Sequence, residues 1–354
     1  MSIKLAINGF GRIGRLAFRR AYEVGGFEVV AINDLVDAKT LAYLLKYDTT
    51  HRGWHQDEID SEVVQDPNTK EFTVNNLVFR GKKIPVLGKK DPKDLKWGEF
   101  GVDLVLECTG RLKGKADGQV HIDNGAKGVI ISAPSSDKDI PTFVYGVNTN
   151  KLTADMTIIS GGSCTTNCLA PVMEVLFKKY GVKGGFMTTI HAYTNDQTTL
   201  DLAKGDFRRG RAAAANIVPT TTGAAKAINL VIPELKGKLM GGAIRVPVID
   251  GSLVDLSLVL EKPVADAAEI NALMKAASEK ELKDVLGYTE DEIVSSDILG
   301  RTEGSIFDAT QTVVFTDTTG TQHVKVVSWY DNEYSFTCQY IRLASAFAKV
   351  LGVK

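Results

Sequence analysis

Three closely spaced glycines near the amino terminus constrain the fold of this chain more than any other feature. Residues 9 to 14 read G-F-G-R-I-G, directly after the apolar run IKLAIN and directly before the helix-like segment RIGRLAFRRAYEVG. In this setting Gly9 permits a tight turn, Gly11 lets the backbone approach a pyrophosphate, and Gly14 lets helix and strand pack closely. The helix start also offers unpaired N–H groups to an anion. The pattern predicts a strand, a phosphate-binding turn and a helix.

An acidic residue in the right place supports this interpretation. Asp34 closes the next apolar run, FEVVAIND, twenty residues after Gly14. A carboxylate there accepts hydrogen bonds from the ribose hydroxyls of NAD and repels the 2′-phosphate of NADP, so NAD is the predicted cofactor. The alternative is a glycine-rich turn that binds no ligand. Arg12 in the same turn either contacts a cofactor phosphate or is an exposed arginine at a helix start.

The rest of the first 160 residues alternates apolar runs with helix-like segments. Runs such as VDLVLEC and GVII are apolar on both faces, which is typical of a parallel sheet built from βαβ units. Residues 72 to 86 interrupt this alternation and predict a hairpin with its turn at Asn75 and Asn76. We expect this hairpin to be an insertion in the same domain.

Polar residues follow two of these runs. Thr109 and Gly110 come after VDLVLEC, and Ser132 comes after GVII. Open parallel sheets bind their ligands at the carboxyl ends of the strands. We therefore place these three residues in the cofactor site, and we expect the neighbouring Cys108 to be a small buried residue.

The pattern of apolar runs changes near residue 160. Longer, more alternating runs follow, such as GGAIRVPVIDGSLVDLSLVLEK, which favour a mixed or antiparallel sheet. Helices are expected from Ala265 to Leu286 and from about Ser335 to Val350. We predict an α/β fold, with a Rossmann dinucleotide-binding domain at residues 1–163 and an α+β catalytic domain with a large mixed sheet at 164–333. The helix at about 334–354 is expected to pack back on the first domain.

Composition excludes several other classes of protein. The 42 Lys+Arg residues balance the 43 Asp+Glu residues, so no chain-wide attraction to nucleic acid or to an anionic membrane is expected. The four cysteines are too few for a disulfide scaffold, which indicates a reducing cytoplasm. The start MSIKLAINGF lacks the apolar core of a secretory signal. The longest uncharged run, Met156 to Met173, is too polar to span a membrane.

Cys164 is the candidate nucleophile. It lies in the run IISGGSCTTNCLAP, at the start of an expected helix, where the dipole and free N–H groups lower a thiol pKa and stabilise an oxyanion. Pro171 suits a first turn only, so we expect the helix to start late or to begin irregularly. His191, in MTTIHAYTNDQ, is the candidate base for a thiolate–imidazolium couple, with a structural histidine as the alternative. Cys168 does not complete a metal site, and we predict no metal.

Anion-binding candidates lie further along the chain. Thr220 to Gly223 precede an expected helix, which again presents hydroxyl and N–H groups. The basic cluster at residues 208–211 is either an anion site or a solvated loop. Arg245 lies in the apolar run GGAIRVPVI, where a lone arginine needs a partner.

Six segments in order, NGFGRIGR, SCTTNCLAP, HAYTNDQ, TTTGAAKA, RVPV and WYDNEY, closely resemble phosphorylating glyceraldehyde-3-phosphate dehydrogenases over essentially the whole chain. The resemblance implies a glycolytic, NAD-dependent oxidoreductase that converts glyceraldehyde 3-phosphate and inorganic phosphate into 1,3-bisphosphoglycerate through a thiohemiacetal and a thioester. It also implies a cytoplasmic homotetramer, with no obligatory nucleic acid and no membrane.

The resemblance assigns roles to individual residues. Cys164 would be the nucleophile and His191 its base. The cofactor would contact Gly9, Phe10, Gly11, Arg12, Ile13, Gly14, Asp34, Thr109, Gly110, Ser132 and Asn332, the last through the nicotinamide carboxamide. The substrate phosphate would lie among Thr194, Asp196 and Arg245, and inorganic phosphate among Ser163, Thr165, Arg209, Thr222 and Gly223.

The chain departs from the family pattern at a few positions. Gly161 and Gly162 replace the common Asn-Ala, Ala203 replaces a proline frequent in NAD-specific members, and Phe336 replaces a tyrosine near the nicotinamide. Erythrose-4-phosphate dehydrogenase, which hydrolyses its acyl-enzyme, is the enzymatic alternative. A non-catalytic role, as a surface adhesin or an RNA-binding protein, is the alternative from another class.

Overall fold

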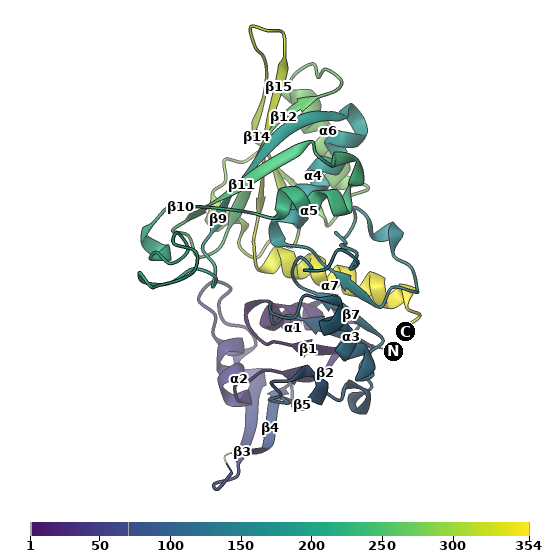
Figure 1. The fold of residues 1–354 in the computed structure, drawn as a ribbon, viewed down its shortest axis with the longest axis vertical. Coiled ribbons are helices and arrows are strands. Elements are labelled where there is room, and N and C mark those ends of the chain that lie inside the picture. The colour runs from purple at the N-terminus through teal and green to yellow at the C-terminus, as the bar shows by residue number, and fades with distance from the viewer. Residues whose placement is uncertain (1, 70, 354) are drawn as a thin grey trace. The chain divides into compact units, whose positions relative to one another are not determined.

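The computed structural model describes residues 2–69 and 71–353, and the chain divides into two compact units (Figure 1). The first unit comprises Met1–Phe143, Lys151–Gly162 and Tyr340–Lys354, and the second comprises Val144–Asn150 and Ser163–Gln339. Each unit therefore contains segments that are distant in the sequence.

The first unit contains the predicted parallel sheet, with helices packed against it (Figure 1). Its five strands lie in the order β2-β1-β6-β7-β8, and every adjacent pair is parallel. Central strands such as β1 carry fully buried residues, because helices cover both faces of such a sheet. The elements are β1 (Ile3–Asn8), α1 (Arg12–Val24), β2 (Phe27–Asn33), α2 (Ala38–Lys46), β6 (Leu104–Glu107), α3 (Lys115–Asp123), β7 (Gly128–Ile131) and β8 (Ile158–Ser160).

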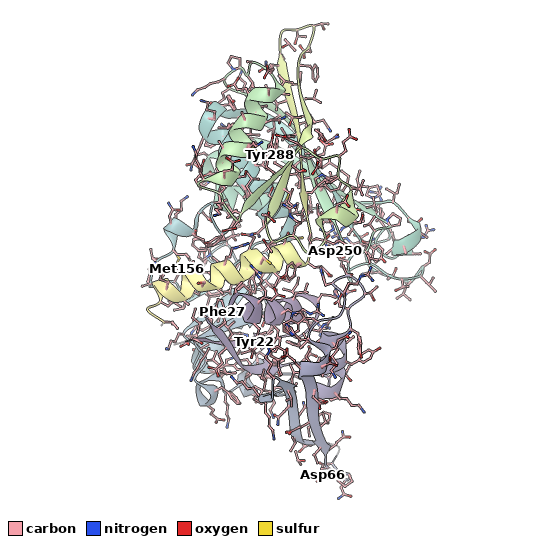
Figure 2. All side chains as sticks on the ribbon, turned by 180° about the vertical axis from the view of Figure 1, so that it is seen from behind. Tyr22, Phe27, Asp66, Met156, Asp250 and Tyr288 are labelled. Carbon is pink, nitrogen blue, oxygen red and sulfur yellow. The ribbon has the colours of Figure 1, made fainter. Side chains whose placement is uncertain are left out.

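A small antiparallel sheet is inserted in this unit. It consists of β3 (Ile59–Gln65), β4 (Phe72–Phe79) and β5 (Lys82–Pro85), with Asp66 at the distant end of the β3–β4 hairpin (Figure 2). The predicted turn at Asn75 and Asn76 is wrong, because β4 continues through both residues. The chain turns instead at Arg80 and Gly81, which have φ values of 50° and 75°. Asn75 is held in the strand because its amide bonds the carbonyl of Val86 and the N–H of Ala38.

The second unit contains a seven-stranded mixed sheet in the order β10-β11-β9-β12-β15-β14-β13. The helices pack on the sheet around a core that includes Leu169, Met173, Met187 and Val326. The mixed sheet confirms the fold class predicted for this half. Its elements are α4 (Cys164–Tyr180), β9 (Val182–Ala192), β10 (Val218–Thr220), α5 (Ala224–Val231), β11 (Leu239–Val246), β12 (Ser252–Leu260), α6 (Ala267–Glu279), β13 (Leu286–Thr289), β14 (Ser305–Thr316) and β15 (Gln322–Tyr330).

Two helix predictions need correction. Helix α6 ends at Glu279, and the apolar residues that continue the helical spacing enter the core from a turn, in which Asp284 has a φ of 66°. Leu286 already belongs to strand β13. Helix α4 is regular from Cys164 onward and holds Pro171 in its interior, where the residue is fully surrounded by buried neighbours. Burial of the apolar face offsets the roughly 3 kcal/mol that an interior proline costs.

The last helix, α7 (Tyr334–Val350), lies within one residue of its predicted bounds. From Tyr340 onward it belongs to the first unit, where the Tyr340 hydroxyl donates to the carbonyl of Ile130. A Cβ at Gly128 would lie 2.8 Å from side-chain atoms of Phe347 and Leu351, so the helix packs directly on β7. Among the described residues, no helix has the length and apolarity that a membrane span requires.

Candidate active site

The glycine turn in the first unit has the geometry expected of a phosphate-binding loop. Gly9 has a φ of 90°, and a Cβ on Gly14 would lie 2.1 Å from the carbonyl oxygen of Gly9. Gly11 precedes α1 as its N-cap, and a Cβ there would meet no atom within 4 Å. Gly9 and Gly14 thus serve the turn itself, whereas Gly11 keeps the space in front of the helix N-terminus open.

A groove of about 420 Å³ lies along this turn. Four predicted cofactor residues line it: Gly9, Gly11, Asp34 and Thr109. Phe10 does not offer its side chain to the groove, because its ring is buried against Phe18. Its N–H already donates to Asp34 Oδ2 at 2.7 Å. The groove also has walls that the sequence did not indicate: Asn8, Asn33, Leu35, Lys89, Lys90, Pro92, Leu95, Arg111 and Leu112.

A buried carboxylate supports the floor of the groove. Glu107 accepts hydrogen bonds from Asn8 Nδ2 at 2.6 Å, from the N–H of Thr109 at 2.8 Å, and from the Thr109 hydroxyl. Oε2, the oxygen that accepts from Asn8, also lies 3.2 Å from His121 Nε2. Because Trp97 Nε1–H donates to His121 Nδ1, the proton of His121 lies on Nε2 and points at Glu107. A polar residue at the end of a buried strand was the available signal for Glu107.

The remaining predicted cofactor residues have varied settings. Arg12 is half-buried at the start of α1 and forms a bidentate ion pair with Asp48. Gly110 is exposed with a φ of 67°, and Ile13 is half-buried in the first turn of α1. Ser132 directly follows β7, and its N–H is bonded to the carbonyl of Glu107.

In the second unit, strand pairing brings the chemical groups to one edge of the mixed sheet. Strands β9 and β11 are parallel, and their register places Arg245 beside His191. Strand β12 runs antiparallel to β15, which places Ser252 opposite Tyr330 at the same end. The residues at this edge come from four strands, which is why no local motif predicts their arrangement.

Cys164 is the first residue of α4, and its Sγ lies 3.5 Å from His191 Nε2. The Ser163 hydroxyl caps the helix by accepting the N–H of Thr166 at 3.1 Å. The two residues that the sequence proposed as nucleophile and base are therefore in contact, with the thiol at the positive end of the helix dipole.

The hydrogen bonds around His191 determine its tautomer. Nδ1 lies 2.7 Å from the carbonyl oxygen of Ala192 and 3.1 Å from Nη1 of Arg245. The two protons of that Nη1 are taken by the Ala192 carbonyl at 2.9 Å and the Thr194 hydroxyl at 2.8 Å. Nδ1 therefore donates to Ala192, and Nε2 presents its lone pair to the thiol.

Burial and local charge oppose each other in this pair. Burial raises the pKa of the Cys164 thiol to about 11, against the Arg245 charge and the Thr165 N–H, which lower it. Burial and Arg245 lower the pKa of His191 to about 4, against the Ala192 carbonyl, which raises it. The separated charges are therefore unfavourable, but transfer of one proton from Sγ to Nε2 leaves the net charge of the pair unchanged.

Tyr330 is a buried residue at this site that sequence reasoning missed. Its hydroxyl lies 2.8 Å from both Thr165 Oγ1 and Thr189 Oγ1, and its ring packs edge-on against His191 with centroids 5.7 Å apart. Thr165, predicted to hold inorganic phosphate, thus has its hydroxyl hydrogen-bonded to Tyr330.

Asn332 follows β15 and is almost fully buried. The hydroxyl of Ser252 accepts the N–H of Ala192 at 3.0 Å and donates to Asn332 Oδ1 at 2.7 Å. This hydroxyl fixes the orientation of the Asn332 amide, so its NH₂ group remains the donor end. Phe336, at a position where the family often has tyrosine, is buried.

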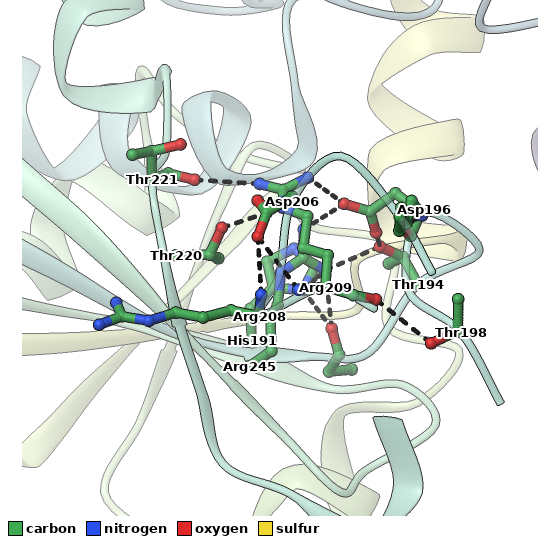
Figure 3. A network of polar contacts seen from close by, with 12 residues as sticks. His191, Thr194, Asp196, Thr198, Asp206, Arg208, Arg209, Thr220, Thr221 and Arg245 are labelled. Carbon is green, nitrogen blue, oxygen red and sulfur yellow. Dashed lines mark hydrogen bonds and ion pairs between the residues drawn. The ribbon is translucent and has the colours of Figure 1, made fainter. Parts of the chain in front are cut away.

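Four predicted phosphate-site residues form one polar network (Figure 3). Arg209 pairs with the Asp196 carboxylate, which also accepts from Thr194, and Arg245 bonds Thr194. Arg209 further donates to Thr220 Oγ1 at 3.0 Å and to the carbonyl of Thr221 at 3.4 Å. The adjoining Thr222 caps the N–H of Ala224 at 3.2 Å, and Gly223 is exposed at the start of α5.

The other candidates lie outside this network or have a supporting role in it. Cys168 is buried, with Sγ 3.6 Å from Ser305 Oγ, and burial raises its pKa to about 12. Cys108, expected to be buried, is half-buried and lines the groove along the glycine turn, and burial raises its pKa to about 12. Arg211 pairs with Asp201 on the surface. All four cysteines are free.

Comparison with known proteins gives a consistent result along the chain. Residues 3–115 match the family model "Glyceraldehyde 3-phosphate dehydrogenase, NAD binding domain", and residues 163–332 match "Glyceraldehyde 3-phosphate dehydrogenase, C-terminal domain". Similar curated proteins named glyceraldehyde-3-phosphate dehydrogenase include those of Clostridium pasteurianum, 54% identical over 98% of this chain and 99% of the relative, and Clostridium acetobutylicum, 52% identical with the same coverage. Glyceraldehyde-3-phosphate dehydrogenase 1 of Bacillus subtilis is 51% identical over 99% of both chains.

Proposed function

The chain belongs to the glyceraldehyde-3-phosphate dehydrogenase family, and from this premise we propose how its own residues carry out the NAD-dependent oxidation and phosphorylation of D-glyceraldehyde 3-phosphate. The observation that carries the proposal is the contact of 3.5 Å between Cys164 Sγ and His191 Nε2 at the start of α4. A thiol with an adjacent base and a helix N-terminus is equipped to form and resolve a covalent acyl intermediate.

The first unit fits the cofactor. The open space in front of Gly11 admits a pyrophosphate to the N–H groups of α1, and Asp34 lies at the end of β2 where a ribose hydroxyl is bound. Gly9 and Thr109 line this groove, and Gly14 lets α1 pack closely on the turn. Gly110 and Ser132 follow β6 and β7, where we expect them to contact the cofactor. NAD, when bound, supplies the hydride acceptor, and the protein supplies its placement. In the second unit, the Asn332 NH₂ group, left free to donate by the Ser252 hydrogen bond to Oδ1, would hold the nicotinamide carboxamide.

Cys164 attacks the substrate aldehyde as His191 Nε2 takes the thiol proton, which gives a thiohemiacetal. The Ala192 carbonyl stabilises the resulting imidazolium because it accepts the Nδ1 proton at 2.7 Å. Conversion of the thiohemiacetal to a thioester on Sγ would release a hydride to NAD, the acceptor, and a proton from the hydroxyl, and the N–H groups at the start of α4 stabilise the oxyanion. His191 first takes the thiol proton, then gives it to the substrate oxygen, and takes it back from the hydroxyl as the hydride leaves.

The polar network provides for the two phosphates. Arg245, Thr194 and Asp196 surround the phosphate of the substrate, while Arg209, Thr222 and Gly223 hold inorganic phosphate, with Ser163 at the helix start. Inorganic phosphate attacks the thioester carbonyl, the C–S bond breaks, and 1,3-bisphosphoglycerate leaves with Cys164 restored. Two guanidinium groups from different elements suit two anions, because each fork binds phosphate in a bidentate manner.

The test compares the wild type with Cys164→Ser. We expect the variant to lose phosphate-dependent NADH formation by at least about 10³-fold and to bind NAD as the wild type does, since the glycine turn and Cys164 lie in different units. NAD binding is measured by calorimetry and NADH by absorbance. Retained activity in the variant would refute the assignment of the nucleophile.

The same assay separates the enzymatic alternative. With erythrose 4-phosphate as substrate and no phosphate present, an erythrose-4-phosphate dehydrogenase hydrolyses its acyl-enzyme and forms NADH at a steady rate. We expect this chain to require inorganic phosphate and to prefer glyceraldehyde 3-phosphate. No feature of the described residues favours an adhesin or RNA-binding role.

We further propose that residues 1–163 and the helix at 334–354 form the NAD-binding domain, and that residues 164–333 form the catalytic domain. The chain is expected to act as a homotetramer in the cytoplasm. Large apolar side chains exposed on the second unit support assembly, among them Phe186, Leu200 and Phe207, which are 68%, 75% and 90% exposed. Light scattering during size-exclusion chromatography measures the assembly directly.

A further inference from the structure

The carboxylate of Asp196 already engages the two arginines that we assign to phosphate binding. Arg209 Nη1 contacts Asp196 Oδ2, and Arg245 Nη2 lies 4.0 Å from the same oxygen (Figure 3). The other oxygen accepts a hydrogen bond from Thr194, which in turn bonds Arg245. Asp196 thus presents to both guanidinium groups the kind of oxygen atoms that a phosphate would present.

The charge of Asp196 decides what it can do there. Burial alone would raise the pKa of Asp196, but the hydrogen bond from Thr194 and the charges of Arg245 and Arg209 lower it overall. The side chain is therefore an anion at neutral pH and has only acceptor oxygens. A phosphate is also an anion with acceptor oxygens, so Asp196 is a competitor for the same guanidinium groups.

We propose that Asp196 is an internal anion that couples the two phosphate sites. A phosphate that binds at Arg209 displaces the carboxylate from that arginine, and the displaced carboxylate then adds negative charge beside Arg245. Occupancy of one site therefore weakens the other. The inference rests on the proposed function, in which the product carries both phosphate groups at once, so that weakened double occupancy favours product release.

Replacement by the isosteric amide isolates the charge. Asp196→Asn removes the competitor and keeps an acceptor for Thr194, so the two arginines present a larger net positive charge. We expect inorganic phosphate to bind roughly three- to tenfold more tightly, the range allowing for the partial exposure of Asp196, whose side chain is 37% exposed. In steady-state assays the KM for phosphate falls while kcat also falls, because product leaves more slowly.

The control removes one charge from the same loop at a residue that pairs with neither Arg209 nor Arg245. Asp201→Asn qualifies, because Asp201 pairs with Arg211 and both side chains are 60% exposed. Calorimetric titration of the full-length protein with inorganic phosphate, at constant ionic strength, measures affinity without any need for turnover. The set comprises the wild type, Asp196→Asn, Asp201→Asn, Arg209→Gln, and the double variant of positions 196 and 209.

The proposal requires tighter phosphate binding in Asp196→Asn, a smaller change in Asp201→Asn, and loss of most of the gain in the double variant. Phosphate binding that is unchanged or weaker in Asp196→Asn would overturn it, because Asp196 would then only hold Arg209 in place. Absence of phosphate binding in every protein of the set would overturn it as well. Failure of the proposed function is distinguishable, since it would appear as a wild type that forms no NADH.

Discussion

Replacement of His191 tests the pairing on which the chemistry depends. Burial favours the neutral form of this pair, so the thiolate forms as His191 Nε2 takes the Cys164 proton across 3.5 Å, and the imidazolium then stabilises the thiolate. Asparagine fills part of the space but cannot take up a proton at neutral pH. We therefore expect His191→Asn to move the thiol titration of Cys164 to higher pH.

The size of this effect follows from the geometry. Two unit charges 3.5 Å apart attract by about 5 kcal/mol at an effective dielectric constant of about 20. Since about 1.4 kcal/mol corresponds to one pKa unit, the upper limit is a shift of about 3.5 pH units. Cys164 is partly exposed, and water screens part of the attraction. We expect the midpoint to move upward by about 1 to 3 pH units.

The rate of alkylation of Cys164 by iodoacetamide, followed against pH and assigned by peptide mass spectrometry, reports the thiolate directly. His323→Asn is the matched control, because His323 pairs with Asp317 near the opposite end of β15 from Tyr330. Superimposable profiles for wild type and His191→Asn would refute the view that the imidazole is the partner of the thiol.

Three further outcomes are expected. Gly11→Ala should lower NAD affinity by at least about tenfold and leave the thermal unfolding temperature unchanged. Gly14→Ala should lower the unfolding temperature, because its Cβ would lie 2.1 Å from the carbonyl oxygen of Gly9. An equal loss of stability in both variants would contradict this division of roles. Burial alone would raise the pKa of Asp48, but the hydrogen bonds from the Arg12 side chain and the His51 N–H, together with the charge of Arg12, lower it to about 2. Asp48→Asn should therefore cost about 1 to 2 kcal/mol at pH 7. This stability is present above the unfolded pKa of about 3.9 and is lost as pH falls toward 2, so urea unfolding should show the two proteins converging in acid. Ser252→Ala should raise the KM for NAD several-fold, because the Asn332 amide loses the hydroxyl that orients it, and Ser252→Thr should restore the low KM. Unchanged kinetics in the alanine variant would exclude this role of the Ser252 hydroxyl.

Local features of this chain were predictable where one short segment determines the conformation. The glycine turn and Asp34 depend on a single strand, turn and helix, and the alternation of apolar runs indicated the parallel sheet. The same apolar spacing misled at Leu286, because Leu282 and its neighbours reach the core from a turn that mimics helical periodicity. The prediction of a turn at Asn75 was wrong because the Asn75 side-chain amide bonds the carbonyl of Val86 in a neighbouring segment.

Arrangements that depend on strand register could not be predicted from the sequence. Cys164 and His191 are 27 positions apart, and they meet only because α4 packs on the sheet where β9 ends. The contact between Arg245 and His191 follows from the parallel register of β11 on β9. The ion pair of Arg209 with Asp196 depends on how two loops fold against each other. Loops have no repeating sequence pattern from which such a contact could be predicted.

The placement of α7 has a consequence for biosynthesis. The first unit takes in the chain from Tyr340 onward, and this stretch packs on β7 through Phe347 and Leu351. A ribosome therefore delivers the stretch that covers β7 long after β7 itself. Until that stretch emerges, part of β7 lacks its packing partner, so a premature stop before Tyr340 would damage a sheet whose strands were made much earlier.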